Sequence, residues 1–331
     1  MAVEAPPVDT VHLHEHEAEQ ANEHLMLDPR PREEMNRMVL EAMTTTTPAF
    51  WVWTGTLAVL VVVCLFGAWI YMATTGMGLA GIRRPVFWGV FIVTFVFWIG
   101  ISHAGTFVSA ILRVFKAEYR RPFTRAAELM TTFGLAAGAL YPLIHLGRVW
   151  VFYWLVPYPN ARGLWPNFRS PLVWDFLAIT TYLLSSTIYL YLPLIPDLAM
   201  ARDRTTGFRQ KAYRLLSLGW RGTEAEWHRL HRAINIFAFA IIPVMFSVHT
   251  IVSWDFAVSQ VAGWHSTIFG PYFITGAILS GISAVATIMF VLRSTMRNFT
   301  YFIRPEHFDA LGKLILVFSM AWAYFFFNEY L

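Results

Sequence analysis

The sequence has little charge and almost no cysteine. Only 14% of its 331 residues are charged, whereas 56% are hydrophobic and 28 are Phe. The single cysteine, Cys64, excludes a disulfide framework, an iron–sulfur cluster ligated by this chain and a zinc ribbon. This composition lies outside the range of soluble domains and indicates an integral membrane protein. The small basic excess is typical of loops that set orientation and contact anionic lipid, so the lipid membrane, and no nucleic acid, is the expected partner.

Seven apolar runs approach the length of about 20 residues that a bilayer-crossing helix needs. Loops and tail on one side of these runs carry twenty Lys and Arg residues, and the other side carries four. The positive-inside rule therefore places the N-terminus in the cytoplasm and the 155–171 loop outside. We expect the spans at residues 50–74, 86–113, 126–154, 171–196, 233–256, 267–293 and 313–331.

Two polar segments lie outside these spans. Residues 1–49 form an acidic cytoplasmic tail without the apolar segment of a cleavable signal peptide, and residues 197–232 form a basic cytoplasmic loop. His12, His14 and His16 in the tail are spaced like metal ligands. A flexible tail rich in Glu and His usually binds nothing specific, so we expect no metal site there.

An internal repeat relates the second and third spans to the sixth and seventh. Shifted by 181 residues, six residues recur: Gly89, Thr94, Gly100, Ile101, Ser102 and Thr106 match Gly270, Thr275, Gly281, Ile282, Ser283 and Thr287. An even number of crossings separates the copies, so the repeat is parallel rather than inverted. A counterpart of the fourth span would require a helix beyond Leu331. We therefore expect that the sequence is truncated or that a partner supplies that helix.

Several ionisable side chains fall at one depth of the predicted membrane, where such groups are costly and indicate a site. The topology places them in the outer half of the bilayer: His145, Arg148, Asp175, His249 and Asp255. Asp175 and Asp255 also suit helix ends, and Arg148 also suits the outer headgroups. His145 shares a helix face with Tyr141 and Arg148 and is the strongest candidate.

Two further polar residues lie deeper. His103 is predicted near the middle of the second span, deeper than the other two histidines, and Glu128 lies near the inner end of the third. They could begin a proton path inward, although for His103 a hydrogen bond to a neighbouring helix is the favoured interpretation. Gly134 and Gly138 have the spacing that lets neighbouring helices approach closely.

A hydroquinone fits this set of residues. Its oxidation needs an aromatic pocket, hydrogen bonds to the ring oxygens and a base that accepts protons as electrons leave. A histidine has a suitable pKa, and a neighbouring carboxylate stabilises its charged form. A haem would need histidines facing each other at matched depth, which the sequence does not predict. We therefore expect no haem or iron–sulfur cluster in this chain, and expect the electrons to leave to a partner docked outside.

Three segments carry a resemblance to a known family. SHAGTFVSAILRVF, RAAELMTTFG and YPLIHLGRVW, within residues 102–150, resemble NrfD-like (polysulfide reductase type) membrane subunits. They are most similar to the quinol-binding ActC-type subunit of bacterial alternative complex III. The resemblance covers residues 50–331 and implies two parallel-repeat four-helix bundles, 50–196 with the quinol site and an incomplete second bundle at 233–331.

The resemblance also implies a function. Family members of this type oxidise menaquinol near the periplasmic face of the bacterial cytoplasmic membrane, next to a partner that carries iron–sulfur clusters. Carried over by position, the quinol-site groups are His145, Asp175 and Asp255. Further implied partners are c-type cytochrome subunits and a second NrfD-like chain.

Three alternatives remain open at this point. In these alternatives the chain is the quinone-reducing subunit of a molybdopterin enzyme, a secondary transporter or a structural anchor. Because the proposed bases lie in the outer half, we expect scalar proton release to the outside.

Overall fold

The fold consists of helices joined by turns. The computed structural model describes residues 33–34, 37–38, 41, 46–82, 89–117, 120–155, 171–260, 265–296, 300 and 302–331. Within this part of the chain, seven helices are long and apolar enough to cross a membrane, which confirms an all-α, multi-pass integral membrane protein. The elements are α3 (Pro48–Leu60), a π-helical turn (Val61–Phe66), α4 (Gly67–Thr75), α5 (Gly89–Val114), α6 (Arg120–His145), α7 (Pro171–Tyr191), α8 (Leu194–Arg204), α9 (Gly207–Leu216), α10 (Glu224–Gln260), α11 (Phe269–Thr295) and α12 (Pro305–Tyr330), with short 3-10 turns at Met77–Ala80 and Val149–Leu155.

Local sequence sets the starts of two spanning helices. The Thr47 hydroxyl accepts a hydrogen bond from the Phe50 backbone N–H at 3.3 Å, with Pro48 at the first helical position of α3. At the start of α12, the Arg304 backbone N–H donates to His307 Nδ1 at 2.9 Å, and Pro305 again occupies the first position. Proline is suited to this position because its missing N–H has no partner in the first turn of a helix.

The third span ends earlier than the sequence predicted. We expected it to continue to residue 154, but α6 ends at His145. Pro142 lacks the N–H that would continue the helical ladder, and Gly147 has a φ of +67°, which reverses the chain. The fifth span is longer than expected because α10 already begins at Glu224, inside the segment predicted as a loop.

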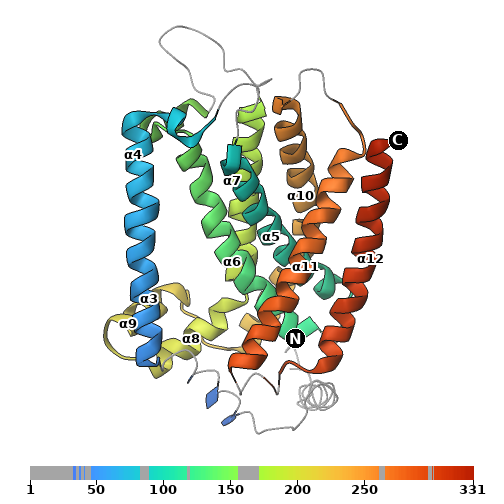
Figure 1. Ribbon diagram of the computed structural model, residues 1–331. Helices are drawn as coiled ribbons and strands as arrows, with labels where there is room; N and C mark the ends of the chain where they lie inside the picture. The colour runs from blue at the N-terminus through green and yellow to red at the C-terminus, as the bar shows by residue number, and fades with distance from the viewer. Residues whose placement is uncertain are drawn as a thin grey trace, which may run out of the picture.

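The helix α5 lies at the centre of the assembly. It packs against α6, α10 and α11, while α7 packs on α10 and α12 packs on α11 (Figure 1). The continuous helix of α3 and α4 stands at the edge, and nearly all its side chains are exposed. The contacts of α10 with α5 and α7 run across the boundary predicted between two bundles. The two-bundle division and the internal repeat stay predictions.

Small residues bring the central helices close together. A Cβ added to Gly281 on α11 would lie 1.9 Å from the Cβ of Ala104 on α5, and one added to Gly100 would lie 3.6 Å from the Cβ of Ala277. These two contacts advance in the same direction along both helices, so α5 and α11 run parallel. On α6, a Cβ at Gly138 would meet Ile99 at 2.7 Å. Backbone proximity of this kind stabilises helix pairs in lipid, where apolar surface alone gives no driving force.

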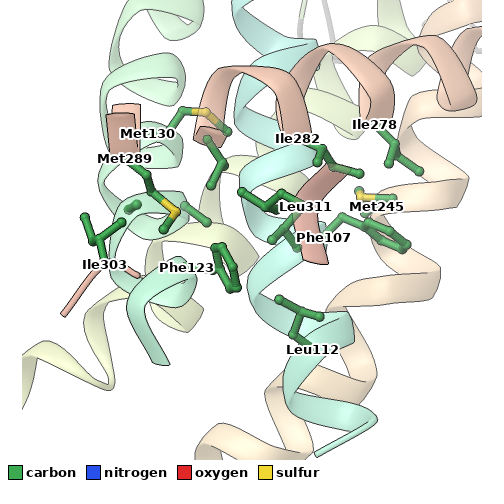
Figure 2. Packing of buried hydrophobic residues seen from close by; sticks show 14 of the residues in the cluster. Phe107, Leu112, Phe123, Met130, Met245, Ile278, Ile282, Met289, Ile303 and Leu311 are labelled. Atoms are coloured by element: carbon green, nitrogen blue, oxygen red, sulfur yellow. The ribbon is translucent and has the colours of Figure 1, made fainter. Parts of the chain in front are cut away.

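An apolar cluster fills the space between α5, α6, α10, α11 and α12, toward the end of the helices that the sequence predicts to face the cytoplasm. This end is called the inner end below, and the opposite end the outer end. Figure 2 shows Phe107 of α5 and Met245 of α10 against Ile278 and Ile282 of α11. Each of these side chains is buried. The cluster is closely packed, and it fixes the depth at which the polar residues of α5 and α10 face each other.

Candidate functional site

Two buried carboxyl groups meet between α7 and α10. Asp175 lies in the second turn of α7, Asp255 lies five residues before the end of α10, and their side chains lie within hydrogen-bonding reach of each other. An ionised carboxylate only accepts hydrogen bonds, so a hydrogen bond between the two requires a proton on one of them. Asp175 Oδ1 and Asp255 Oδ2 are buried without a hydrogen-bond partner among the described residues. The sequence predicted both residues as site members, and the structure brings them together.

Aromatic side chains connect this pair to the end of α6. The Phe256 ring, next to Asp255, lies 5.8 Å from the ring of Phe95 on α5, centroid to centroid. Phe95 in turn lies 6.4 Å from the ring of Tyr141 on α6. One turn further along α6, the His145 ring lies 6.3 Å from the ring of Phe91. Tyr141 and His145 therefore line the same face of α5 at the outer ends of the helices.

An apolar layer separates this outer region from a second polar group. Leu135 of α6, Ala178 of α7 and Val252 of α10 pack together and are buried. Each of these residues lies about one turn or more further inward on its helix than Tyr141, Asp175 or Asp255, respectively.

Below the apolar layer, His103 of α5 and His249 of α10 are hydrogen-bonded through their Nδ1 atoms, with ring centroids 4.5 Å apart. Both are almost fully buried, and neither Nε2 atom has a hydrogen-bond partner among the described residues. The ring of Tyr182 lies 3.7 Å from that of His103, and the ring of Phe273 lies 5.0 Å from that of His249.

The predicted depth of His249 was therefore wrong. We placed it with Asp255 in the outer half and placed His103 deeper, but the structure joins the two imidazoles. The reason is that α10 continues to Gln260, beyond the predicted end of the span at residue 256. At 1.5 Å per residue, His249 lies about 16 Å from that end, near the depth of His103.

A stripe of hydroxyl groups continues inward from the histidines. The Tyr182 hydroxyl lies 3.0 Å from Ser102 Oγ and 3.1 Å from Thr106 Oγ1. Further inward, the Tyr189 hydroxyl lies 3.1 Å from Ser109 Oγ. The sequence analysis missed these residues, although two spacings predict them. The α5 hydroxyls recur at steps of four and three residues, and the two tyrosines are seven residues apart. Each set therefore shares one helix face.

The comparison with known families decides the classification. A family model described as "Polysulphide reductase, NrfD" matches residues 78–330. The chain belongs to the NrfD family. The matched segment includes every residue of the carboxyl pair, the imidazole pair and the hydroxyl stripe.

Three curated proteins are similar to this NrfD chain. A putative dimethyl sulfoxide reductase membrane subunit of Halobacterium salinarum is 30% identical over 80% of this chain and 56% of its own length. A selenate reductase subunit of Mesobacillus selenatarsenatis is 26% identical over 62% of this chain and 48% of its own. An Hdr-like menaquinol oxidoreductase integral membrane subunit of Archaeoglobus fulgidus is 24% identical over 81% and 57%. The chain spans about half the length of these relatives.

The inner end of this NrfD chain carries an ionic cluster. The Arg125 guanidinium donates to Glu128 Oε2 at 3.1 Å and to Asp197 Oδ2 at 2.8 Å. Burial raises the pKa of Asp197 above its ordinary value of 3.8, and the charge of Arg125 opposes that shift. Glu128, which the sequence predicted on a proton path, is buried. It lies toward the same end of the helices as Tyr189.

Arg148 does not belong to the buried site. It follows the end of α6, its backbone N–H donates to Leu146 O at 2.7 Å, and its side chain is exposed. The expected common face of Arg148 with His145 required a longer helix. The three tail histidines and residues 156–170 of the outer loop lie outside the described residues. Within the described part, no group of three His, Cys, Asp or Glu side chains is arranged to hold a metal ion.

Proposed function

We propose that this chain is the quinol-oxidising membrane subunit of an oxidoreductase complex, with menaquinol as substrate. The observation that carries the proposal is the contact between the buried carboxyl groups of Asp175 and Asp255, at the level of α10 where Phe256 packs on Phe95. Buried carboxyl groups are costly in a bilayer and are retained where they bind or move charge. The surrounding rings suit a flat aromatic substrate that enters from the lipid.

The chemistry requires acceptors for two protons. A hydroquinone loses two electrons and two protons as both O–H bonds break and the ring becomes a quinone. A carboxyl pair that holds one proton accepts one more at its ionised member. The neutral imidazole of His145, on the neighbouring helix, accepts the second. Tyr141, one turn away on α6, supplies a hydroxyl for hydrogen bonding to a ring oxygen.

The electrons leave to a partner subunit, because one cysteine cannot supply the four thiolates that an iron–sulfur cluster requires. We propose an iron–sulfur subunit at the side where α7 begins and α10 ends. Absence of a haem or iron–sulfur cluster in this chain remains part of the proposal. So do the periplasmic location of the site, the bacterial inner membrane and the cytoplasmic N-terminus.

The type of complex is a further step. The resemblance of residues 102–150 to alternative complex III adds c-type cytochrome subunits and a second NrfD-like chain as partners. The names of the Halobacterium and Mesobacillus relatives favour a second candidate, in which the electrons pass to a catalytic reductase subunit, such as a molybdopterin enzyme. The quinol site is the same in both.

The test uses the purified complex that contains this chain, with oxidation of a soluble menaquinol analogue as the readout. We expect Asp175→Asn to lower kcat about 100-fold, the usual contribution of a proton acceptor. Asp309→Asn, the same change at an exposed ion pair on α12, is the control and should retain full turnover. Unchanged turnover both in Asp175→Asn and in Asp255→Asn, the same change at the other carboxyl group, would disprove the proposal. Alkalinisation on the outer side during turnover would contradict the expected proton release.

A further inference from the structure

The short helix α9 presents large apolar side chains away from the protein. Phe208 is 85% exposed and Leu215 is 76% exposed, and Leu218 just beyond the helix is 69% exposed. Phe208 and Leu215 are seven residues apart, so they lie on the same helix face. An apolar face of this kind in water is unfavourable, which indicates that something covers it.

Basic side chains surround this apolar face. At 100° per residue, Arg209 lies about 100° to one side of Phe208 and Lys211 about 60° to the other side, with Arg214 beyond Lys211. All three are exposed or partly exposed, and none has an ion pair in the part of the chain that the structure describes. The nearby acidic residues Asp203 and Glu226 are already paired with Arg202 and Arg221.

The chain holds α9 against the inner ends of the spanning helices. The Tyr191 hydroxyl at the end of α7 donates to the backbone oxygen of Leu216. Arg202 of α8 donates to Trp220 O at 3.0 Å and to Ser217 Oγ at 3.4 Å. Figure 1 shows α8 and α9 crossing the lower ends of the long helices instead of extending away from them. This position corresponds to the boundary between the hydrocarbon core and water.

We propose that α9, with Leu218, is an interfacial helix that binds anionic phospholipid. Phe208, Leu215 and Leu218 insert among the upper acyl carbons, and Arg209, Lys211 and Arg214 contact the headgroup phosphates. Helices with this combination of an apolar face and basic flanks lie in the plane of the membrane surface. The positive charge complements an anionic lipid surface, and the spanning helices already place that surface beside α9.

The depth of α9 is tested with the full chain reconstituted in lipid vesicles. In a Cys64→Ser background, an environment-sensitive fluorophore is attached at Leu215→Cys or at Arg214→Cys, which is one residue away but 100° around the helix. The quencher is phosphatidylcholine with a nitroxide on its acyl chain. We expect about twofold or greater quenching at position 215 relative to 214. Equal quenching at both positions would overturn the proposal, and shielding of position 215 from both lipid and aqueous quenchers would overturn it in favour of a protein partner.

The lipid class is tested by comparing vesicles of phosphatidylcholine alone with vesicles that also contain phosphatidylglycerol. We expect stronger quenching at position 215 when phosphatidylglycerol is present, and loss of this difference at about 1 M salt, where the screening length is about 3 Å. Replacing Arg209, Lys211 and Arg214 with Gln should lower the retention of phosphatidylglycerol by the purified chain about tenfold or more. Lys313→Gln on α12 is the control. Equal retention by the triple variant and the control would overturn the lipid assignment.

Discussion

The helix α10 contributes one residue to each of two buried pairs of like groups, and the two pairs differ in the proton chemistry that they can carry out. Asp255 and His249 are six residues apart on α10, about 9 Å along its axis. Asp255 is joined to Asp175 of α7, and His249 is joined to His103 of α5. The first pair lies near the ends of α7 and α10, whereas the second lies beneath an apolar layer and against Tyr182.

The difference follows from the hydrogen-bonding capacity of each group. A carboxyl pair that shares one proton has a free site for a second, so it can take a proton from a substrate. Two neutral imidazoles joined through Nδ1 leave one Nε2 as an acceptor and the other as a donor. The imidazole pair can therefore pass a proton along without changing its net protonation. We infer that the outer pair acts on substrate and that the inner pair fixes α5 against α10.

The largest expected effect tests whether the carboxyl pair acts as one unit. Asp255→Asn keeps a hydrogen-bonding side chain but cannot accept the proton, so turnover should fall about 100-fold with little change in stability. Because residues that act together are not additive, the double variant with Asp175→Asn should be no slower than either single variant. Steady-state oxidation of a menaquinol analogue by the purified complex measures this. A product of the two single effects, about 10,000-fold, would show that the carboxyls work separately.

A smaller effect is expected at the imidazole pair. His249→Ala removes one partner, leaves His103 buried without its hydrogen bond and opens a cavity, so the free energy of unfolding should fall by about 2–3 kcal/mol. Turnover per folded molecule should fall less than about tenfold. Thermal unfolding in detergent, with exposed His228→Ala as the control, gives the stability. A stable variant with turnover as low as that of Asp255→Asn would assign the imidazole pair to the reaction itself.

The smallest effect extends the comparison to a carboxyl group outside the spans. Burial raises the pKa of Asp197, so the folded chain binds this proton more tightly than the unfolded chain. The stability that protonated Asp197 contributes is fully present below the ordinary pKa of 3.8, and it is lost as the pH rises through the raised pKa of the folded chain. Asp197→Asn should therefore change stability by less than about 1 kcal/mol, although it breaks the bond to Arg125. Unfolding at about pH 4 and about pH 7 tests the sign, because the variant should gain relative to the native chain at the higher pH.

The number of spans, their order and the common depth of Asp175 and Asp255 were accessible from the sequence, because hydropathy and loop charge encode depth. The sequence did not predict that these two carboxyl groups pair with each other. The contact between His103 and His249 was not, since the error of four residues at the end of α10 displaced His249 from its true depth. Arg148 was misplaced for a related reason: the effect of Pro142 and Gly147 on the end of α6 was overlooked. Tyr182 was missed because the seven-residue spacing of Tyr182 and Tyr189 was not compared with the spacing of the hydroxyl residues on α5.

The helix α10 carries His249 and Asp255 on the rod of helix that follows its internal Pro243. A rotation of this rod about its axis would separate Asp255 from Asp175 and His249 from His103 together, since six residues of helix turn through a fixed angle. Occupancy of the site at the carboxyl pair and alignment of the imidazole pair are thus linked mechanically through α10, without any intervening chain of contacts. A partner that rotated this end of α10 would therefore act on both pairs at once.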